Sequence, residues 1–319
     1  MKKVLITAAI TTFGRPELLR RAIHSVLNQN FRDFELLIID DAGQPCVDKL
    51  VDSFSDPRIK YYRHKKNMGL ASARNTALHN ARGKYIAYLD DDDEWFPEKL
   101  KLQYHLAEYL NKQKIVVYCG QEVVRVNGSK YFNTPQISGL ISEAVKNKKL
   151  STISSSTLFP VAGLKKIGGF DPVFRSQIDH DIWMNMAMNG WLAEFVDKPL
   201  VRSREHFNPR ITSDYSTRLE TINRYFEKWQ PLLVKLQTPP GAAKYKIDYT
   251  NYVIGWLARE QFKQGKYVLG LCCLKLLKVH NLSSLFIYMD TLSKCGLYIL
   301  LRWFYITLPI PNMFRLFPI

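Results

Sequence analysis

The feature that most constrains the fold is an apolar run, residues 85–89, that ends in four consecutive aspartates, Asp90 to Asp93. A short apolar run of this kind indicates a buried strand. Adjacent carboxylates repel one another unless positive charge lies among them. Carboxylate oxygens suit Mg²⁺ or Mn²⁺, which bind through carboxylates and substrate phosphates. Because ligands gather at the carboxyl ends of parallel strands, the run predicts a metal and diphosphate site. A solvated acidic loop, or capping aspartates ahead of a helix at 95–109, is the open alternative.

In the chain before this run, segments with the hydrophobic period of a strand alternate with segments that have the period of a helix. Strands are predicted at 4–10, 34–39 and 59–63, and helices at 16–29, 47–54 and 69–80. Strand and helix in alternation, with short connections, are typical of a doubly wound, mainly parallel α/β sheet. Asp41 follows the second strand as Asp90 follows the fourth. Both carboxylates are therefore expected on one rim of the sheet.

The chain after residue 105 is less regular. We expect a strand at 114–126, a polar, irregular loop at 129–150, a helix ending near Asn189, and strand-like segments at 192–196 and 200–206. A further helix is predicted at 213–237, followed by a break at Pro239-Pro240-Gly241. The predicted domains are a catalytic domain at 1–211, with halves 1–105 and 106–211, and a basic, apolar helical region at 212–319.

The net charge of +16 indicates a polyanionic partner, such as nucleic acid, an anionic membrane or a phosphorylated substrate. Residues 241–319 hold ten Lys or Arg but three Asp or Glu. Charges interrupt their apolar stretches, so residues 297–317 suit lying on a membrane better than crossing it. Packing on the catalytic domain, or on a second copy in a homo-oligomer, is the alternative. No nucleic-acid motif is present. Five cysteines without metal-ligand spacing indicate reduced thiols in the cytosol.

Four segments, considered together, carry a family resemblance. They are residues 11–19, 25–41, 67–75 and 83–93. In order and spacing they resemble the donor-binding half of glycosyltransferase family 2, which comprises inverting enzymes with the GT-A fold. The resemblance is strong over 3–105, moderate over 150–210 and slight after 215. It implies a Rossmann-like mixed sheet flanked by helices, here followed by a membrane-associating helical extension.

The resemblance also implies a nucleotide-sugar site and a divalent metal, Mn²⁺ or Mg²⁺. The implied donor-binding residues are Thr11, Phe13, Arg15, Asp41, Asn67, Arg74, Asp90 and Asp91. Asp92 is the implied metal ligand, with Asp90 and His206 as further candidates. The family more often has Tyr where Phe13 stands and Asn where Gly14 stands. Alternatively, Thr11 and Thr12 only cap the helix at 16–29.

The catalytic base of such enzymes lies in an acidic pair before a Trp-containing helix. Asp179-His180-Asp181-Ile182-Trp183 resembles that motif, with Asp179 at the base and Asp181 in reserve, because Ile178 stands where Glu is common. The acceptor side is expected to include Gly168, Gly169, His180 and Trp183. Simple capping of the helix by these aspartates is the alternative.

The sequence thus predicts a metal-dependent inverting glycosyltransferase. It would move a sugar from a nucleoside diphosphate, UDP by expectation, to a hydroxyl of a glycan or lipid-linked acceptor. The resemblance implies bacterial surface polysaccharide or lipopolysaccharide synthesis, on the inner face of the plasma membrane. Two alternatives are a nucleotidyltransferase, which needs a Gly-rich basic loop that Gly14-Arg15-Pro16 matches poorly, and a non-catalytic basic binding protein.

Overall fold

The computed structural model describes residues 4–134, 137–147, 154–205 and 214–277. The chain divides into two compact units. The first comprises Met1–Asn208 and Asn223–Gln237, and the second comprises Pro209–Ile222 and Thr238–Ile319. The division begins close to the domain boundary predicted at 211/212, but residues 223–237 belong with the first unit.

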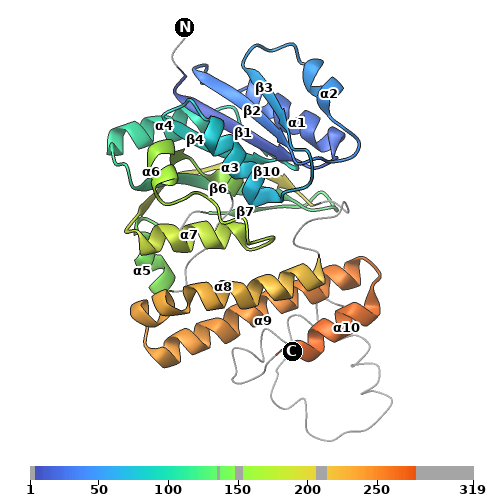
Figure 1. Ribbon diagram of the computed structural model, residues 1–319, viewed down its shortest axis with the longest axis vertical. Coiled ribbons are helices and arrows are strands. Elements are labelled where there is room, and N and C mark those ends of the chain that lie inside the picture. The colour runs from blue at the N-terminus through green and yellow to red at the C-terminus, as the bar shows by residue number, and fades with distance from the viewer. Residues whose placement is uncertain (1–3, 135–136, 148–153, 206–213, 278–319) are drawn as a thin grey trace, which may run out of the picture. The chain divides into compact units, whose positions relative to one another are not determined.

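The first unit is built on a largely parallel sheet of five strands in the order β3-β2-β1-β4-β9 (Figure 1). Its strands are β1 Ile6–Thr12, β2 Phe34–Asp40, β3 Ile59–Arg63, β4 Tyr85–Asp90 and β9 Phe159–Pro160. The first four pair in parallel, and β9 runs antiparallel to β4. The alternation of strand and helix therefore predicted both the parallel pairing and the shared rim.

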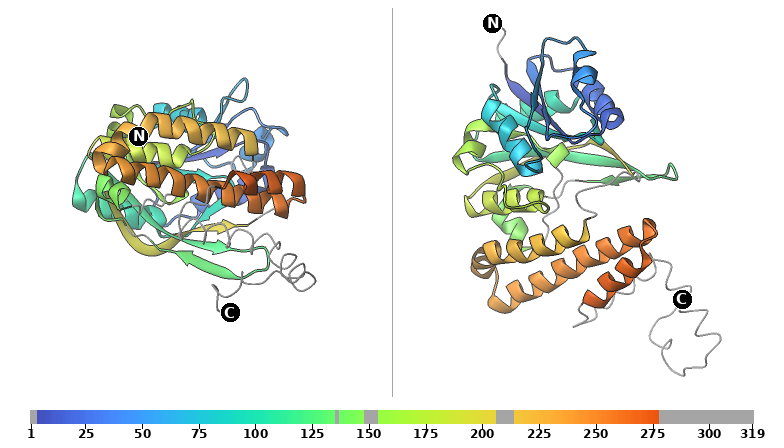
Figure 2. Two further views of the ribbon diagram at one scale, coloured as in Figure 1. Left: turned by 90° about the horizontal axis from the view of Figure 1, so that it is seen from below. Right: turned by 45° about the vertical axis from the view of Figure 1, so that its right-hand side comes forward.

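A second sheet continues the same unit, in the order β5-β10-β6-β7, with β8 paired to β10. Its strands are β5 Asp93–Trp95, β6 Ile115–Val124, β7 Lys130–Asn133, β8 Gly139–Leu140 and β10 Leu192–Arg204. Figure 2 shows β6 and β7 as a hairpin at the edge of this sheet. The two segments expected at 192–196 and 200–206 form one strand, β10, with irregular pairing around Pro199. Proline has no N–H to donate, so the ladder is interrupted but not ended.

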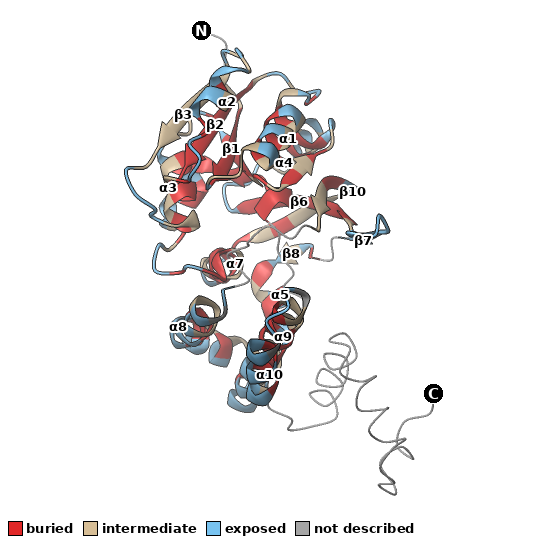
Figure 3. Cartoon of the chain, turned by 90° about the vertical axis from the view of Figure 1, so that its right-hand side faces the viewer, coloured by how far each residue is buried: buried red, intermediate tan, exposed pale blue. Residues whose placement is uncertain are grey.

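Helices cover the sheets of this unit. They are α1 Pro16–Leu27, α2 Asp48–Asp52, α3 Leu70–Asn80, α4 Lys99–Leu110, α5 Ile141–Lys146, α6 Val161–Lys166 and α7 Ile178–Met188, with a 3₁₀ turn, η1, at Ser154–Ser156. Figure 3 shows β1 and β2 of the first sheet as buried, whereas the edge strand β3 is intermediate. Every residue of β1 and β2 is buried. A strand that is covered on both faces is usually rich in apolar residues, and most residues of β2 are apolar, whereas β1 also buries three threonines.

The expectation of an irregular loop at 129–150 is wrong for its described part, which holds β7, β8 and α5. The strands are short, and β7 is exposed along its length, so neither shows the hydrophobic alternation of a half-buried strand.

Three further helices follow, α8 Tyr215–Leu236, α9 Pro239–Lys263 and α10 Tyr267–Leu276. The break expected at Pro239-Pro240-Gly241 is instead the first turn of α9. Thr238 caps this turn by accepting a hydrogen bond from the Gly241 N–H at 3.3 Å. A proline is tolerated there because the first N–H groups of a helix have no partner within it. Across the described residues, no helix is both long and apolar enough to span a bilayer. The segment expected on a membrane, 297–317, lies outside the described residues.

Candidate active site

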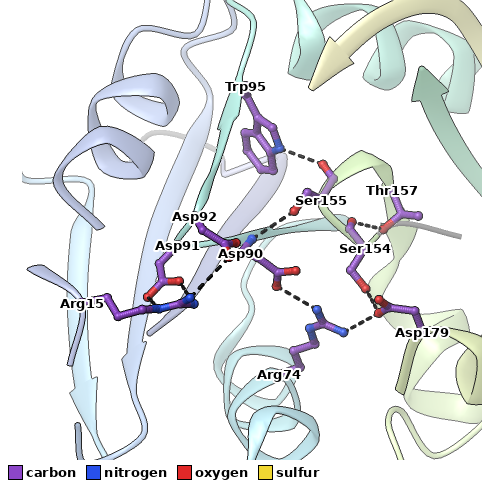
Figure 4. A network of polar contacts seen from close by, with 10 residues as sticks. All are labelled: Arg15, Arg74, Asp90, Asp91, Asp92, Trp95, Ser154, Ser155, Thr157 and Asp179. Carbon is purple, nitrogen blue, oxygen red and sulfur yellow. Dashed lines mark hydrogen bonds and ion pairs between the residues drawn. The ribbon is translucent and has the colours of Figure 1, made fainter. Parts of the chain in front are cut away.

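The acidic run lies where β4 ends, and its members have different surroundings (Figure 4). Asp90 is the register partner of Thr11 on β1. Asp91 is fully buried. Its carboxylate accepts hydrogen bonds from the Thr12 hydroxyl at 2.7 Å and from the Arg15 Nε at 3.2 Å, and a second Arg15 nitrogen completes a bidentate ion pair. Asp91 therefore anchors the residues after β1 to β4.

Three of the four carboxylates converge. Asp90, Asp92 and Asp93 each offer an oxygen, and these oxygens lie within 4.8 Å of one another. Burial, reinforced by the charges of the other two, raises the pKa of Asp93 to about 8. Converging carboxylate oxygens are the hard ligands that Mg²⁺ and Mn²⁺ prefer. The residues present therefore fit a divalent cation.

Asp91 is not part of that group. Burial raises its pKa to about 6, although the Arg15 charge and the Thr12 hydrogen bond oppose the rise. Arg15 also reaches Asp92 at 3.3 Å. An arginine expected to bind the nucleotide sugar thus contacts the acidic run directly.

Arg74 connects the acidic run to the predicted catalytic base. It is fully buried in α3, and it contacts Asp90 with one terminal nitrogen at 2.8 Å and Asp179 with the other at 2.7 Å. Its burial would lower the pKa of the guanidinium, but the two carboxylates outweigh burial and raise it. Arg74 therefore remains a cation between the two carboxylates. The sequence had placed both Arg74 and Asp90 near the nucleotide sugar, and the structure adds Asp179 to the pair.

Asp179 lies in the first turn of α7, and its carboxylate has one engaged and one open oxygen. Oδ1 accepts hydrogen bonds from Arg74 and from the Ser154 hydroxyl (Figure 4). No partner of Oδ2 is found within the described ranges, and about a third of the side chain, 34%, is exposed. The open oxygen is accessible to a hydroxyl group of a ligand.

The reserve candidate for the base, Asp181, lies in a different environment. Its side chain is 3% exposed and accepts hydrogen bonds from Lys228 Nζ and Trp229 Nε1, each at 2.8 Å. In this arrangement, Asp181 is a packing residue of α7 and cannot reach an acceptor hydroxyl. Trp183, expected on the acceptor side, is likewise 1% exposed and packs edge-on against Tyr118. Its ring therefore fixes α7 in the core.

On the nucleotide side, Asp41 uses both oxygens to hold the loop before α3. They accept the N–H groups of Met68 at 2.8 Å and Gly69 at 2.7 Å, and His64 contacts the same carboxylate at 2.7 Å. The Phe13 ring is 51% exposed after β1, as stacking on a base requires. The expected contacts of these residues and of Thr11 with a nucleotide stay predictions.

Gly14, where the family more often has Asn, is required by its backbone. Its φ is +63°, and an added Cβ would lie 2.2 Å from the carbonyl oxygen of Gln44 in the loop after β2. A side chain does not fit between these two loops. Asn67 lies exposed in the loop before α3.

The other residues expected on the acceptor side lie between α6 and α7 and in the first turn of α7. Gly169 adopts a φ of +67° and approaches Asn75 of α3, so its role is close packing, and Gly168 precedes it with a φ of +86°. His180 is partly buried, with its ring 6.3 Å from that of Tyr225. His206, the further candidate metal ligand, lies outside the described residues.

Sequence reasoning missed three residues of this site. Asp93 is not among the metal ligands expected from the sequence, but it begins β5 and its carboxylate converges with those of Asp90 and Asp92. Ser154 and Ser155 were given no role. Ser155 accepts the Asp90 N–H at 3.1 Å, while Ser154 contacts Asp179. The only signal in the sequence was an unusual polar run, Ser154 to Thr157, between apolar residues, which is fully buried here.

Comparison with known proteins identifies related sequences. The model of the family described as glycosyl transferase family 2 matches residues 7–167. The Rickettsia typhi protein RT0329, an uncharacterised glycosyltransferase, is 28% identical over 243 residues, which is 73% of this chain and 72% of the relative. The Escherichia coli protein WfgD, a UDP-Glc:alpha-D-GlcNAc-diphosphoundecaprenol beta-1,3-glucosyltransferase, is 29% identical over 269 residues, 83% of this chain and 100% of WfgD.

Among solved structures, Staphylococcus aureus TarS (residues 1–349), in complex with UDP-GlcNAc, is similar to this chain. It matches with a TM-score of 0.60 and 16% identity, covering 86% of this chain and 82% of TarS. The likeness confirms the fold expected from the sequence: sheets flanked by helices, followed by further helices.

Proposed function

Because the chain belongs to glycosyltransferase family 2, we propose that it transfers a sugar with inversion, from a UDP-sugar to a hydroxyl of a lipid-linked or glycan acceptor. The alternative of a non-catalytic binding protein does not fit a member of this enzyme family. The proposal makes Asp179 the base and the cluster of Asp90, Asp92 and Asp93 the metal site. One observation carries it: Arg74 joins Asp90 of the metal site to Asp179, whose second oxygen is open.

Inversion in a single displacement needs a base on the side of the sugar opposite the departing diphosphate. Asp179 Oδ2 would accept the proton of the acceptor hydroxyl, because Oδ1 is already occupied by Arg74 and Ser154. Arg74 keeps the carboxylate close to the acidic cluster, so that the attacking hydroxyl and the leaving group meet at one sugar carbon. When bound at the cluster, a divalent cation would stabilise the negative charge of the diphosphate.

The substrate class is supported by two relatives. WfgD is named for a UDP-glucose donor and a diphosphoundecaprenol acceptor, and the TarS structure contains UDP-GlcNAc. The E. coli protein WcaA, 31% identical over 193 residues, is named as a putative colanic acid biosynthesis glycosyl transferase. We infer from these names that this chain also acts in bacterial surface-glycan synthesis. The net charge of +16 suits a diphosphate-bearing acceptor at an anionic bilayer, with the enzyme peripheral on the cytoplasmic face.

The test is a panel of nucleotide sugars, assayed for binding and turnover with Mn²⁺, with Mg²⁺ and with EDTA. Wild type is compared with Asp92→Asn, which loses a candidate ligand, and with Asp56→Asn, an aspartate that pairs with Arg58 away from the site. We expect turnover of one UDP-sugar that EDTA abolishes, that Asp92→Asn lowers by at least about 100-fold and that Asp56→Asn leaves unchanged. Failure of every nucleotide sugar to bind in the presence of metal would contradict the proposal.

A further inference from the structure

The contacts of Asp179 are unevenly divided between its two oxygens. Arg74 and Ser154 both donate to Oδ1. An arginine and a carboxylate prefer a bidentate pairing, in which two parallel N–H groups contact both oxygens. Arg74 contacts Asp179 through one nitrogen only. Further contacts must therefore prevent Arg74 from also binding Oδ2, the oxygen that would accept the proton.

One restraint comes from Asp90. It binds the other terminal nitrogen of Arg74 at 2.8 Å, so that the guanidinium is held between two carboxylates. The buried Arg74 Nε has no hydrogen-bond partner in the described part of the chain. This restraint fixes the arginine, but it leaves the carboxylate of Asp179 free to rotate about its own side-chain bonds.

Ser154 supplies the restraint on the carboxylate itself. Its side chain is nearly fully buried, and its hydroxyl donates to Asp179 Oδ1. The serine is rigidly placed, because Thr157 donates to its carbonyl oxygen both from its main-chain N–H, at 3.0 Å, and from its hydroxyl, at 2.6 Å. With Oδ1 tied to this turn, Oδ2 is directed away from Arg74.

The same turn also contacts the acidic cluster. Ser155 accepts a hydrogen bond from the Asp90 N–H at 3.1 Å and forms a side-chain hydrogen bond with Asp93. Its carbonyl oxygen accepts the Trp95 indole N–H at 2.8 Å. Two neighbouring serines of η1 therefore contact the predicted base and the predicted metal site.

We propose that Ser154 is a positioning residue for the Asp179 base. Its hydroxyl holds Oδ1 so that Arg74 contacts one oxygen only and Oδ2 remains open to the acceptor hydroxyl. Through Ser155, the turn sets the position of the base relative to the metal-binding carboxylates. This inference rests on the proposed function, because it assigns a role to a residue that acts through Asp179.

The test compares Ser154→Ala with Ser154→Thr, which keeps a hydroxyl. The matched control is Ser138→Ala, since Ser138 also donates to a carboxylate, that of Glu194 at 2.9 Å, outside the site. In Ser154→Ala, kcat is expected to fall by about 10- to 100-fold, while the donor Kd stays within about twofold. Ser154→Thr should recover most of the kcat, and Ser138→Ala should match wild type. A crystal structure of Ser154→Ala should show both oxygens of Asp179 on Arg74.

Three results would overturn the inference. One is an unchanged kcat in Ser154→Ala, the second is a parallel loss of donor binding and kcat, and the third is an Asp179 carboxylate that keeps its orientation in the Ser154→Ala crystal. An inactive wild type would instead contradict the proposed function, and the crystal structure would still decide whether Ser154 sets the carboxylate.

Discussion

Lys228 of α8 donates a hydrogen bond to Asp181 of α7 at 2.8 Å, and it also pairs with Asp171 at 2.8 Å. The lysine is 32% exposed, whereas the Asp181 side chain is 3% exposed. Burial raises the pKa of Asp181, although Lys228 and Trp229 oppose the rise. The stretch 223–237 therefore belongs to the fold of the catalytic unit and contributes the partners of a buried carboxylate.

Lys228→Met should destabilise the first unit by about 2 kcal/mol, because it removes one of the two side-chain donors, Lys228 and Trp229, that contact the buried Asp181 carboxylate. Urea unfolding followed by tryptophan fluorescence measures the change. Lys244→Met removes an exposed pair with Asp248 and is expected to change stability by less than about 0.5 kcal/mol. Equal effects of the two substitutions would show that the Asp181 contact contributes no more than a surface pair.

Arg74→Lys should abolish most transfer activity. A lysine ammonium cannot hold two carboxylates with separate, fixed nitrogens, so Asp179 loses its position relative to Asp90. We expect kcat to fall by at least about 100-fold. Arg82→Lys is the control, since Arg82 pairs with Glu35 near the start of β2, away from the site. A fully active Arg74→Lys enzyme would be incompatible with the bridging role.

Asp93→Asn should weaken metal binding, because it removes one of the three converging carboxylates. Isothermal titration with Mn²⁺ is expected to show an affinity about 10- to 100-fold lower than that of wild type. Glu94→Gln is the adjacent control. Glu94 pairs with Arg204 at 2.9 Å and is absent from the converging group, so its removal should leave the affinity unchanged. Wild-type affinity in Asp93→Asn would restrict the metal site to the other two carboxylates.

Lys99 should give the protein a distinctive dependence of stability on pH. Burial lowers the pKa of Lys99 from 10.5 to about 8. Between these values the unfolded chain binds a proton that the folded chain does not, so stability rises with pH in this window. The contribution expected from Lys99 alone between pH 7.5 and pH 9.5 is about 2 kcal/mol, measured as the difference between wild type and a variant without the lysine.

Lys99→Met should lose this gain, since its side chain does not titrate. The ammonium group of Lys99 contacts Gln103 at 2.7 Å and lies 4.1 Å from the centre of the Trp95 ring, so the methionine fills a similar path beside an aromatic ring. Urea unfolding of both proteins at the two pH values provides the comparison. Identical slopes in wild type and variant would assign the pH dependence to other groups.

The sequence predicted the elements whose signal is local. The strand at 59–63 has the expected bounds, and the helix at Pro16 begins where expected. In both cases the hydrophobic period and the residues that end the element lie within the segment itself. Placement of Asp41 and Asp90 on one rim followed from parallel pairing, which the register of Thr12 with Asp40 and of Thr11 with Asp90 confirms.

Other features depended on contacts between distant residues and could not be predicted. Asp181 was the reserve candidate for the base, with helix capping as the alternative, and its partner Lys228 lies 47 residues along the chain, where no local pattern indicates it. The contact of Ser154 could not be predicted either, because its hydroxyl donates to Asp179, which lies 25 residues later in the chain. Pro239 was misinterpreted for a different reason: the rule that proline ends helices was applied where a helix begins.

The ion pair of Arg74 and Asp179 also has a consequence for the time at which the enzyme becomes active during its synthesis. The two residues are separated by 105 positions, and Ser154 lies between them in the chain. A nascent chain that has released only β1 to β4 carries residues proposed to bind the nucleotide sugar but lacks Asp179, the proposed proton acceptor. Domains that depend on distant contacts cannot complete their folding before both partners have left the ribosome. On the proposed function, a growing chain cannot transfer sugar before residue 179 has left the ribosome, because the residues assigned to donor binding precede the assigned base in the sequence.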